Sequence, residues 1–384
     1  MILSTFRFIK SSGWSIQPFP AMDSANTLIL VFAAPEFIDD PDPIKQLSFH
    51  YPHSIIIGCS TAGEIYDEQI EDHTISVAIM QFEKTEMTLS VKKLDDANIS
   101  YDVGKTILQD LIHERLRGIF VLSDGLHVNG SELVKGLRPS DRDDIVITGG
   151  LAGDSSRFKQ TWIIVNGDIF VDKVAAVGFY GDHIRIGHGS KGGWDIFGPA
   201  RRITRSKYNI LYELDGKSAL ALYKEYLGDK ASGLPATGLL FPLAIRKNID
   251  DPKQLVRTIL GVDEEAGSLI FAGDMPIGYL AQLMRANFDR LITGAKQAGE
   301  LAISSYKNPV SGDHPSLLIA ISCVGRRLLL GERTEEEIMS VLNIFPRETK
   351  LVGFYSYGEI SPYVKGECEL HNQTMTLTLF SEEI

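Results

Sequence analysis

One pattern occurs three times along this chain of 384 residues: an apolar run, a polar spacer compatible with a helix, and a second apolar run ending in a glycine-rich turn with a carboxylate. The copies span residues 28–64, 119–154 and 317–359. Continuously apolar runs are typical of parallel strands that are buried on both faces, and such strands are joined by crossover helices. Each copy therefore predicts a βαβ unit.

The turns that close the three copies are related to different degrees. Gly58 to Glu64 has the same spacing as Gly353 to Glu359, whereas the turn that ends at Asp154 is one residue shorter. We interpret the first and third copies as an internal duplication and the second as a looser relative.

Between the copies the pattern favours antiparallel strands and a few helices. Alternation with a period near two predicts a hairpin over 74–82 and 86–92, and a meander over 162–187 with a turn at Asn166-Gly167-Asp168. Helices are expected at 103–115, 217–227, 278–298 and 334–342, the second with Asp215 as N-cap. The predicted fold class is α+β, with mixed sheets built from repeated βαβ units and antiparallel hairpins. The loosest stretches are 34–43, 228–237 and 305–315, and the middle one is the expected domain boundary.

Charge and composition exclude several classes of function. With 38 Lys and Arg against 50 Asp and Glu, the formal net charge is −12. Such a chain lacks the basic stripe that nucleic-acid binders use, and it would be repelled by an anionic membrane surface. No run approaches the length of a spanning helix, no leader pattern is visible, and the three cysteines form no C-x-x-C pair. We therefore expect a cytoplasmic protein with no nucleic-acid or membrane partner.

Two segments match phosphate-binding motifs, but neither has the neighbouring residues that such a site requires. Residues 187–192 fit G-x-G-x-x-G, but the segment that follows is not helical, as a dinucleotide site requires. Gly216-Lys217-Ser218 resembles the end of a P-loop, but Leu211 stands where the first glycine is needed. The nine histidines are scattered, and no zinc spacing occurs.

Cys59 is a candidate nucleophile, because it lies in a glycine-rich turn whose backbone amides could lower the pKa of its thiol. The alternative is a small buried side chain, the commoner fate of a free cysteine.

Several motifs together resemble one known family. Residues 57–65 resemble the opening signature of the N-terminal FIST domain, residues 148–154 its second glycine-rich turn, and residues 193–216 its end. Residues 271–276, 322–326, 353–362 and 370–376 resemble the C-terminal FIST domain. The resemblance implies two pseudo-related FIST domains, over 26–222 (sensory) and 223–376 (signal transduction).

The family resemblance also implies a function. FIST proteins are regarded as intracellular ligand-sensing modules that work with histidine kinases or cyclic-di-GMP enzymes, and amino acids have been proposed as ligands. A bacterial subset with a similar layout is described as haem-bound sensors of nitric oxide. We therefore expect a non-catalytic sensor that binds a small ligand, either directly or through haem, and regulates a separate signalling partner. The alternative is an enzyme that uses Cys59 or the turn carboxylates on a small amide or amino-acid-like substrate.

The candidate site residues follow from where ligands settle in such folds. Ligands of α/β sheets bind outside the carboxyl ends of strands, where glycine-rich turns present backbone amides. The pocket candidates are Cys59, Ser60, Thr61, Glu64, Trp194, Arg326, Tyr357 and Glu359. The two glutamates could hold an ammonium or guanidinium group, or they could cap backbone amides within the fold; Arg326 could bind a ligand carboxylate, or could hold Glu359 or Asp154.

Haem would need an axial ligand, usually histidine, and an apolar pocket. His188 lies before Trp194 and Phe197, which could cover a porphyrin, and His371 lies beside polar residues that could orient its ring. For each histidine two interpretations are open: it is an iron ligand, or it is a structural side chain held by hydrogen bonds. The haem would be non-covalent, because C-x-x-C-H is absent.

Overall fold

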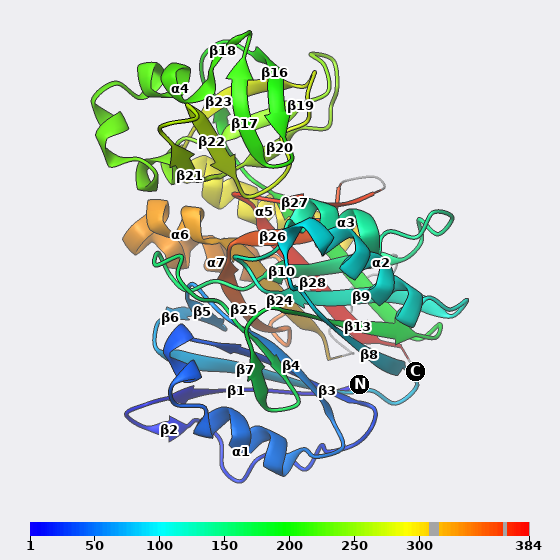
Figure 1. Cartoon of the computed structure of the whole chain (residues 1–384). Helices are drawn as coiled ribbons and strands as arrows, with labels where there is room; N and C mark the ends of the chain where they lie inside the picture. Colours follow the sequence, from blue (N-terminus) through cyan, green and yellow to red (C-terminus); the bar gives the residue numbers. More distant parts are fainter. Residues whose placement is uncertain (307–314, 364–366, 384) are drawn as a thin grey trace.

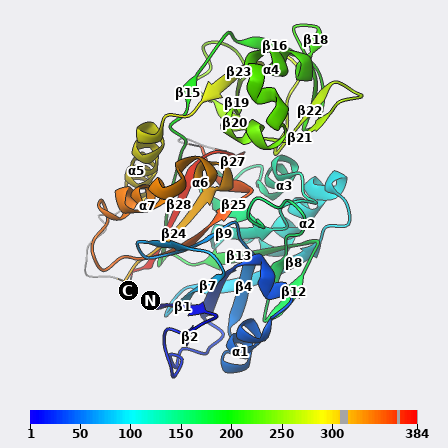
Figure 2. The same cartoon turned by 90° about the vertical axis from the view of Figure 1, so that its left-hand side faces the viewer.

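The computed structural model describes residues 1–306, 315–363 and 367–383. Three mixed sheets form a body, and a fourth sheet stands on one end of it (Figure 1). The chain termini lie close together at the side of the body, as both side views show (Figures 1 and 2). Most of the predicted loose stretch 305–315, with His314, lies outside the described residues.

The body consists of three equivalent units. In each, two parallel strands lie at the centre and two antiparallel strands follow on one side. In the order outer strand, parallel pair, returning strand, the first unit has β1 (Ile2–Ile9), β3 (Thr27–Ala33), β4 (Ile55–Ser60) and β7 (Thr74–Gln81). The second has β8 (Glu86–Lys93), β9 (Leu116–Ser123), β10 (Val146–Leu151) and β13 (Lys173–Tyr180). The third has β14 (Ile184–Lys191), β24 (Leu317–Cys323), β25 (Lys350–Ser356) and β28 (Met375–Glu382).

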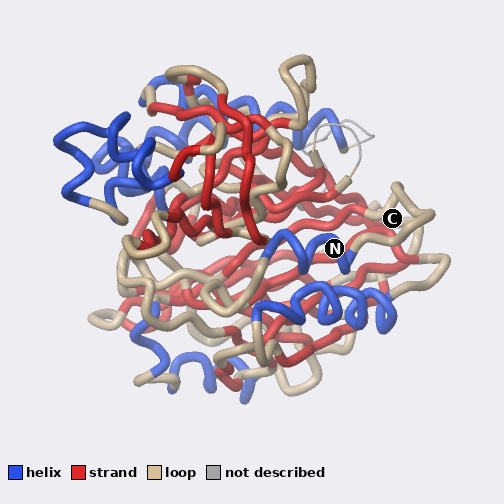
Figure 3. The backbone as a smooth tube through the Cα atoms, turned by 45° about the horizontal axis from the view of Figure 1, so that its top comes forward, coloured by secondary structure: helices blue, strands red, loops and turns tan. Residues whose placement is uncertain are grey.

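Helices lie on the outside of the body, and the strands lie inside it (Figure 3). They are α1 (Asp42–His50) on the first unit, α2 (Ser100–Leu111) and α3 (Gly130–Leu137) on the second, and α5 (Phe288–Ser305), α6 (Val324–Leu330) and α7 (Thr334–Leu342) on the third. Thus the predicted βαβ units are confirmed in all three copies, including the second.

Each unit lends a hairpin to a neighbouring unit. The hairpin β5 (Glu64–Tyr66)–β6 (Gln69–Glu71) leaves the first unit and pairs with β25 of the third. The hairpin β26 (Gly358–Pro362)–β27 (Cys368–His371) leaves the third and pairs with β10 of the second. The hairpin β11 (Ile163–Val165)–β12 (Asp168–Phe170) leaves the second and pairs with β4 of the first. The three units are therefore interlocked in a ring.

The space between the three sheets is the main core. Its members are fully buried side chains from all three units, among them Phe32, Ile57, Phe120, Val177 and Phe354. The rings of Phe32 and Phe354 stack across it with centroids 4.7 Å apart. A second core packs α2, α3, α5 and α7 on the outer faces of two sheets, and a third packs α1 on the remaining sheet.

The fourth sheet is an insertion between β14 and α5. Its nine strands enclose a separate core with α4 (Ala219–Leu227). The strands are β15 (Asp195–Ile196), β16 (Arg201–Lys207), β17 (Ile210–Leu214), β18 (Lys217–Ser218), β19 (Leu243–Arg246), β20 (Leu255–Arg257), β21 (Ile259–Asp263), β22 (Ser268–Phe271) and β23 (Leu280–Arg285). The predicted boundary between residues 222 and 223 falls inside α4, and it stays a prediction.

Some local predictions are wrong for identifiable reasons. Strands β7 and β8 are not a hairpin but belong to different sheets. The Glu382 carboxylate holds the link between them, because the backbone amides of Glu83, Lys84 and Thr85 donate to it at 2.7 to 2.8 Å. The meander holds for β11 and β12 alone, since β13 and β14 pair with distant strands.

The expected helices also differ at their starts. Residues 280–285 are strand β23, and α5 begins after Asn287, whose side chain accepts from Arg290 N. The N-cap of α4 is Ser218 rather than Asp215. The G-x-G segment lies in β14, where a Cβ on Gly189 would lie 2.0 Å from the Ala298 carbonyl oxygen of α5. Close packing of helix on strand accounts for these glycines.

Candidate functional site at the strand ends

The carboxyl ends of the three parallel pairs meet at the centre of the ring. Gly58, Gly149 and Gly353 occupy equivalent places there, facing Val31, Val121 and Ala320 of the neighbouring strands. A Cβ on any of these glycines would lie 1.8 to 2.1 Å from the facing carbonyl oxygen. Only glycine lets the strands approach this closely.

Backbone hydrogen bonds close the centre of the ring. Ala62 N donates to Tyr355 O at 2.8 Å, Gly153 N to Ser60 O at 2.9 Å, and Tyr357 N to Leu151 O at 3.3 Å. Each bond joins one unit to the next. The turns therefore do not enclose a recess on the axis itself.

In the first and third turns the glutamate is a buried structural cap. Glu64 accepts from Thr61 Oγ1, and from the backbone N (3.0 Å) and Oγ1 (2.9 Å) of Thr74, where the returning strand begins. Glu359 accepts in the same way from Ser356 Oγ (2.7 Å) and from the backbone N (3.2 Å) and Oγ1 (2.9 Å) of Thr374. Burial outweighs these donors and raises the pKa of both carboxyl groups to about 8.

The second turn is built differently. Asp154 is buried and accepts from the backbone amides of residues 158, 159 and 160 at 2.8 to 2.9 Å, and from the Tyr357 hydroxyl. These bonds shape residues 155–160 into an outward loop with positive φ at Ser155 and Phe158. The Phe158 ring stacks on Tyr357 with centroids 4.5 Å apart.

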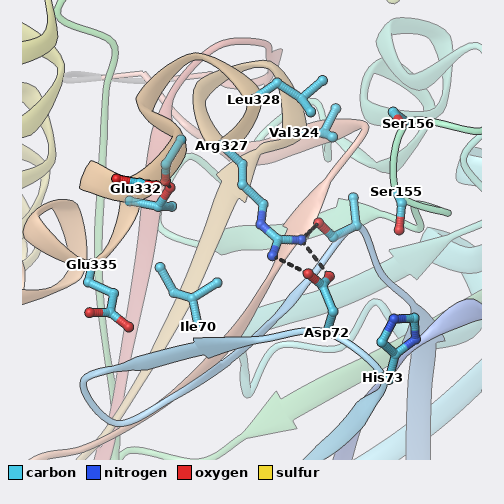
Figure 4. A pocket seen from close by; sticks show the side chains of 13 residues that line it. Ile70, Asp72, His73, Ser155, Ser156, Val324, Arg327, Leu328, Glu332 and Glu335 are labelled. Atoms are coloured by element: carbon cyan, nitrogen blue, oxygen red, sulfur yellow. Dashed lines mark hydrogen bonds and ion pairs between the residues drawn. The ribbon is translucent and has the colours of Figure 1, made fainter.

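A groove, which we call the strand-end groove, lies beside this loop. It comprises a hollow of about 590 Å³ and a smaller one of about 210 Å³, and the two share Asp72, His73 and Ser155. Figure 4 shows Ser155 and Ser156 on one side of it and Glu332 and Glu335 on the other. Such a volume suits a small molecule.

Charged side chains line the groove, and some are already paired. Arg327 of α6 bridges to Asp72 with two bonds of 2.8 Å and donates to Ala62 O at 2.6 Å (Figure 4). This pairing holds the Asp72 pKa below its usual range. The His73 ring contacts the Glu36 carboxylate.

Three exposed charged side chains of the groove have no ion-pair partner among the described residues: Arg157, Glu332 and Glu335. Arg157 Nε donates to the Asp154 carbonyl oxygen at 3.0 Å, which fixes its stem, and the side chain is exposed. Unpaired charges of both signs can hold a ligand that carries the opposite charges.

Most predicted pocket residues are in the framework of the ring. Cys59 is in the main core, where burial raises the pKa of its thiol well above the usual range. Ser60 accepts from Trp162 N at 3.1 Å, and Thr61 binds Glu64. Glu64 is 1% exposed and is the member of the predicted set that lines the groove. The nucleophile alternative for Cys59 has no support in this geometry.

Arg326 and Trp194 are also bonded within the fold. Arg326 is fully buried and pairs with Glu337 of α7, so it holds neither Glu359 nor Asp154. The Trp194 Nε1 donates to Gln373 O at 2.9 Å. Neither lines the strand-end groove.

The two candidate haem ligands do not fit a haem site. His371 Nε2 lies 3.0 Å from Ser361 O, its ring is 5% exposed, and Tyr363 stacks on it. His188 faces a different hollow, lined by charged residues that include Arg138 and Arg142. Burial lowers the pKa of both imidazoles to about 4.

The two aromatic side chains that were expected to cover a porphyrin beside His188, Trp194 and Phe197, pack elsewhere. Trp194 packs in a cluster with Met284 and Leu291, and Phe197 lies under Arg285. Haem binding stays a prediction from the family resemblance. Within the described ranges, no three His, Cys, Asp or Glu side chains gather in a way that could hold a metal ion.

No motif in the sequence marks the groove residues Asp72, His73, Arg157 and Arg327. Asp72 and His73 directly precede Thr74, the residue that Glu64 caps, and His73 has φ of 65°. The equivalent places in the other units hold Asp172 (φ 70°) and Gln373 (φ 61°). A polar residue just before each returning strand was the available signal.

The fold and site define a class: an α+β protein of three interlocked repeats with a ligand-sized groove at its strand ends. The family model of the FIST N domain matches residues 27–217, and that of the FIST C domain matches residues 219–362. The chain belongs to the FIST family, whose domains are of a predicted sensory, ligand-binding type.

Two individual proteins are also similar. The uncharacterized protein MJ1623 of Methanocaldococcus jannaschii is 26% identical over 371 residues, covering 83% of this chain and 66% of that protein. The chain thus spans just under two thirds of that relative's length. A crystal structure of cyanuric acid hydrolase from A. caulinodans aligns at 11% identity over 78% of this chain and 100% of that one, with a TM-score of 0.19. Agreement that weak carries no argument about fold or function.

No helix in the described part of the chain is both long and apolar enough to cross a membrane.

Proposed function

We propose that this chain is a sensor that binds a small charged molecule in the strand-end groove and signals to a separate protein. The observation that carries the proposal is the set of unpaired charges around the groove: Arg157 lines its smaller hollow, and Glu332 and Glu335 line its larger one. A molecule with a carboxylate and an ammonium group would satisfy both kinds of charge. Amino acids, which the family resemblance suggests, have that chemistry.

The walls of the groove suit a sensor. They come from the second turn, from the hairpin β5–β6 that the first unit lends to the third, and from α6 of the third unit. A ligand that touches all three favours the arrangement in which they lie closest, and so shifts the population of conformations. The output partner is proposed to be a histidine kinase or a cyclic-di-GMP enzyme, as the resemblance implies.

A binding screen tests the proposal. The full chain is titrated by calorimetry with the twenty amino acids and with simple amines and carboxylates. The recovered compounds are then checked by mass spectrometry for chemical change. We expect at least one compound to bind and return unchanged, and Arg157→Ala to weaken it at least tenfold, about 1.4 kcal/mol. Steady conversion of a bound compound, or binding that Arg157→Ala leaves intact, would overturn the proposal.

A more specific form of this proposal is a haem-bound sensor of nitric oxide. Neither of its candidate iron ligands, His188 and His371, lines the strand-end groove. Adding haemin to the protein tests it. A Soret band that His188→Ala or His371→Ala abolishes would support that version, and the absence of a band would remove it.

A further inference from the structure

A second hollow, which we call the interlayer chamber, lies between the body and the fourth sheet. Its volume is about 680 Å³. From the fourth-sheet insertion it takes residues 233–240 and β21, and from the body it takes residues 156–158 and Leu328 of α6. Its apolar wall residues are Phe158, Leu234, Pro235, Leu239, Leu240, Ile259, Leu260 and Leu328.

The chemistry of the chamber differs from that of the strand-end groove. Aliphatic and aromatic side chains make up most of its wall, whereas four of the thirteen residues around the larger hollow of the groove are Asp, Glu or Arg at Asp72, Arg327, Glu332 and Glu335. Water is held poorly by an apolar wall, because it finds few hydrogen-bond partners there. Filling the chamber with an apolar group is therefore favourable.

Arg157 stands where the two spaces meet. It lines both the chamber and the smaller hollow of the groove, and Ser156 and Leu328 line both the chamber and the larger hollow. Two other arginines of the body, both on α6, are paired with carboxylates: Arg326 with Glu337, and Arg327 with Asp72. Arg157 has no such carboxylate in the part of the chain that the structure describes.

We propose that the interlayer chamber binds the apolar chain of a small carboxylic acid whose carboxylate pairs with Arg157. A guanidinium group can donate two parallel hydrogen bonds to a carboxylate, and Arg157 has its Nη groups uncommitted to any described carboxylate. The apolar wall accepts the remainder of the molecule. This inference goes beyond the proposed function, because it places a second class of ligand in a separate hollow that shares Arg157 with the strand-end groove.

The same arrangement explains how binding would be transmitted. The chain of the ligand lies against residues 233–240 of the insertion and Leu328 of the body, and its head binds the second turn. One molecule thus contacts the insertion, α6 and the second turn together, and its binding stabilises by mass action the arrangement in which all three are in place.

The test uses octanoate as the probe, with octylamine and octanol as matched compounds of the same chain and with butanoate as the short acid. The full-length protein is titrated by calorimetry with each of them. We expect octanoate to bind, octylamine not to bind, and each added methylene between butanoate and octanoate to tighten binding about two- to fourfold.

Variants separate the head from the chain. Arg157→Ala should weaken octanoate at least tenfold. Leu328→Asp, at a side chain that is 47% exposed and so is not needed for folding, should do the same by placing a charge at the wall. Arg205→Ala, at an exposed arginine on β16 that does not line the chamber, is the matched control and should leave binding unchanged.

Several outcomes overturn the inference. They are equal binding of octanoate and octylamine, no dependence on chain length, or an Arg157→Ala variant that binds octanoate within twofold of wild type. If a short amino acid binds through Arg157 while octanoate does not, the chamber inference fails and the proposed function stands. If neither class binds, both fail.

Discussion

The first and second strand-end turns hold equivalent places in the ring, yet one is closed and the other is open. In the first, Glu64 is buried and links the hairpin β5–β6 to the start of β7 by accepting two hydrogen bonds from Thr74. In the second, Asp154 lies one residue earlier and gathers the amides of residues 158–160, so the chain bulges outward. The third turn, with Glu359, repeats the closed form.

The difference shows how a repeated fold acquires a site. Where the units have the same structure, their polar side chains form hydrogen bonds that stabilise the ring, as the buried Glu64 and Glu359 do. Where one unit departs from the others, the loop that results contributes Ser155, Ser156 and Arg157 to a groove. In this molecule, the position that breaks the repeat is the better candidate for function.

The largest effect is expected at the glycines that all three turns share. Gly58→Ala, Gly149→Ala and Gly353→Ala each place a Cβ within 2.1 Å of a backbone carbonyl oxygen, so each should lower the free energy of unfolding by at least about 3 kcal/mol. Urea denaturation measures this. A variant that loses less than about 1 kcal/mol would show that its unit is not equivalent to the others.

Removing a closed-turn carboxylate should also destabilise the protein. Glu64→Ala or Glu359→Ala leaves the amide and hydroxyl of Thr74 or Thr374 unpaired in a buried place, and we expect a loss of about 2 to 3 kcal/mol. The control is Glu335→Ala, an exposed groove carboxylate, which should change stability by less than about 0.5 kcal/mol. Similar losses in all three variants would contradict the distinction.

The closed turns should also make stability depend on pH. Burial raises the pKa of Glu64 and Glu359 to about 8, above the value of about 4.3 that an unfolded chain has. Their contribution to stability is therefore fully present below about pH 4 and is lost as the pH rises through 8. Melting temperatures from pH 5 to 9 should fall less steeply in the double variant Glu64→Gln, Glu359→Gln. An unchanged slope would mean that other groups set it.

The open turn should respond locally. Asp154→Asn weakens the acceptor for three amides, and we expect about 1 kcal/mol of lost stability with faster hydrogen exchange at residues 158–160. Amides of the hairpin β5–β6 serve as the internal reference, and their exchange should not change. Loss of protection in both places would mean that the loop and ring unfold together.

The smallest change in stability belongs to Arg157→Ala. The side chain is exposed and makes one backbone hydrogen bond, so the free energy of unfolding should stay within about 0.5 kcal/mol of wild type. A larger loss, measured by the same urea denaturation, would make Arg157 part of the framework and would weaken its assignment to a ligand.

Local pattern was enough to predict the βαβ units. The apolar runs at 28–33 and 55–60 have no polar face to expose, and they became β3 and β4 at the centre of a sheet. The helix at 334–342 was predicted with its correct bounds. The Asn166-Gly167 turn also formed, with positive φ at both residues.

Long-range pairing was beyond the same reasoning. Nothing near Thr74 or Glu86 in the sequence tells that Glu382, almost 300 residues away, separates their strands. Likewise, Arg327 meets Asp72 across 255 residues, so the groove is assembled from parts with no common motif. The turn carboxylates Glu64 and Glu359 recur along the chain, but both are structural caps of the ring.

The exchange of hairpins has a consequence for how the protein can be divided. Each sheet of the body contains two strands that another unit supplies, so no single cut of the chain leaves every sheet whole. A fragment ending at residue 217 would keep β10 but lose β26, its neighbour, and would present a bare edge for aggregation. The two family segments therefore mark sequence similarity, while the unit that folds is the whole interlocked ring.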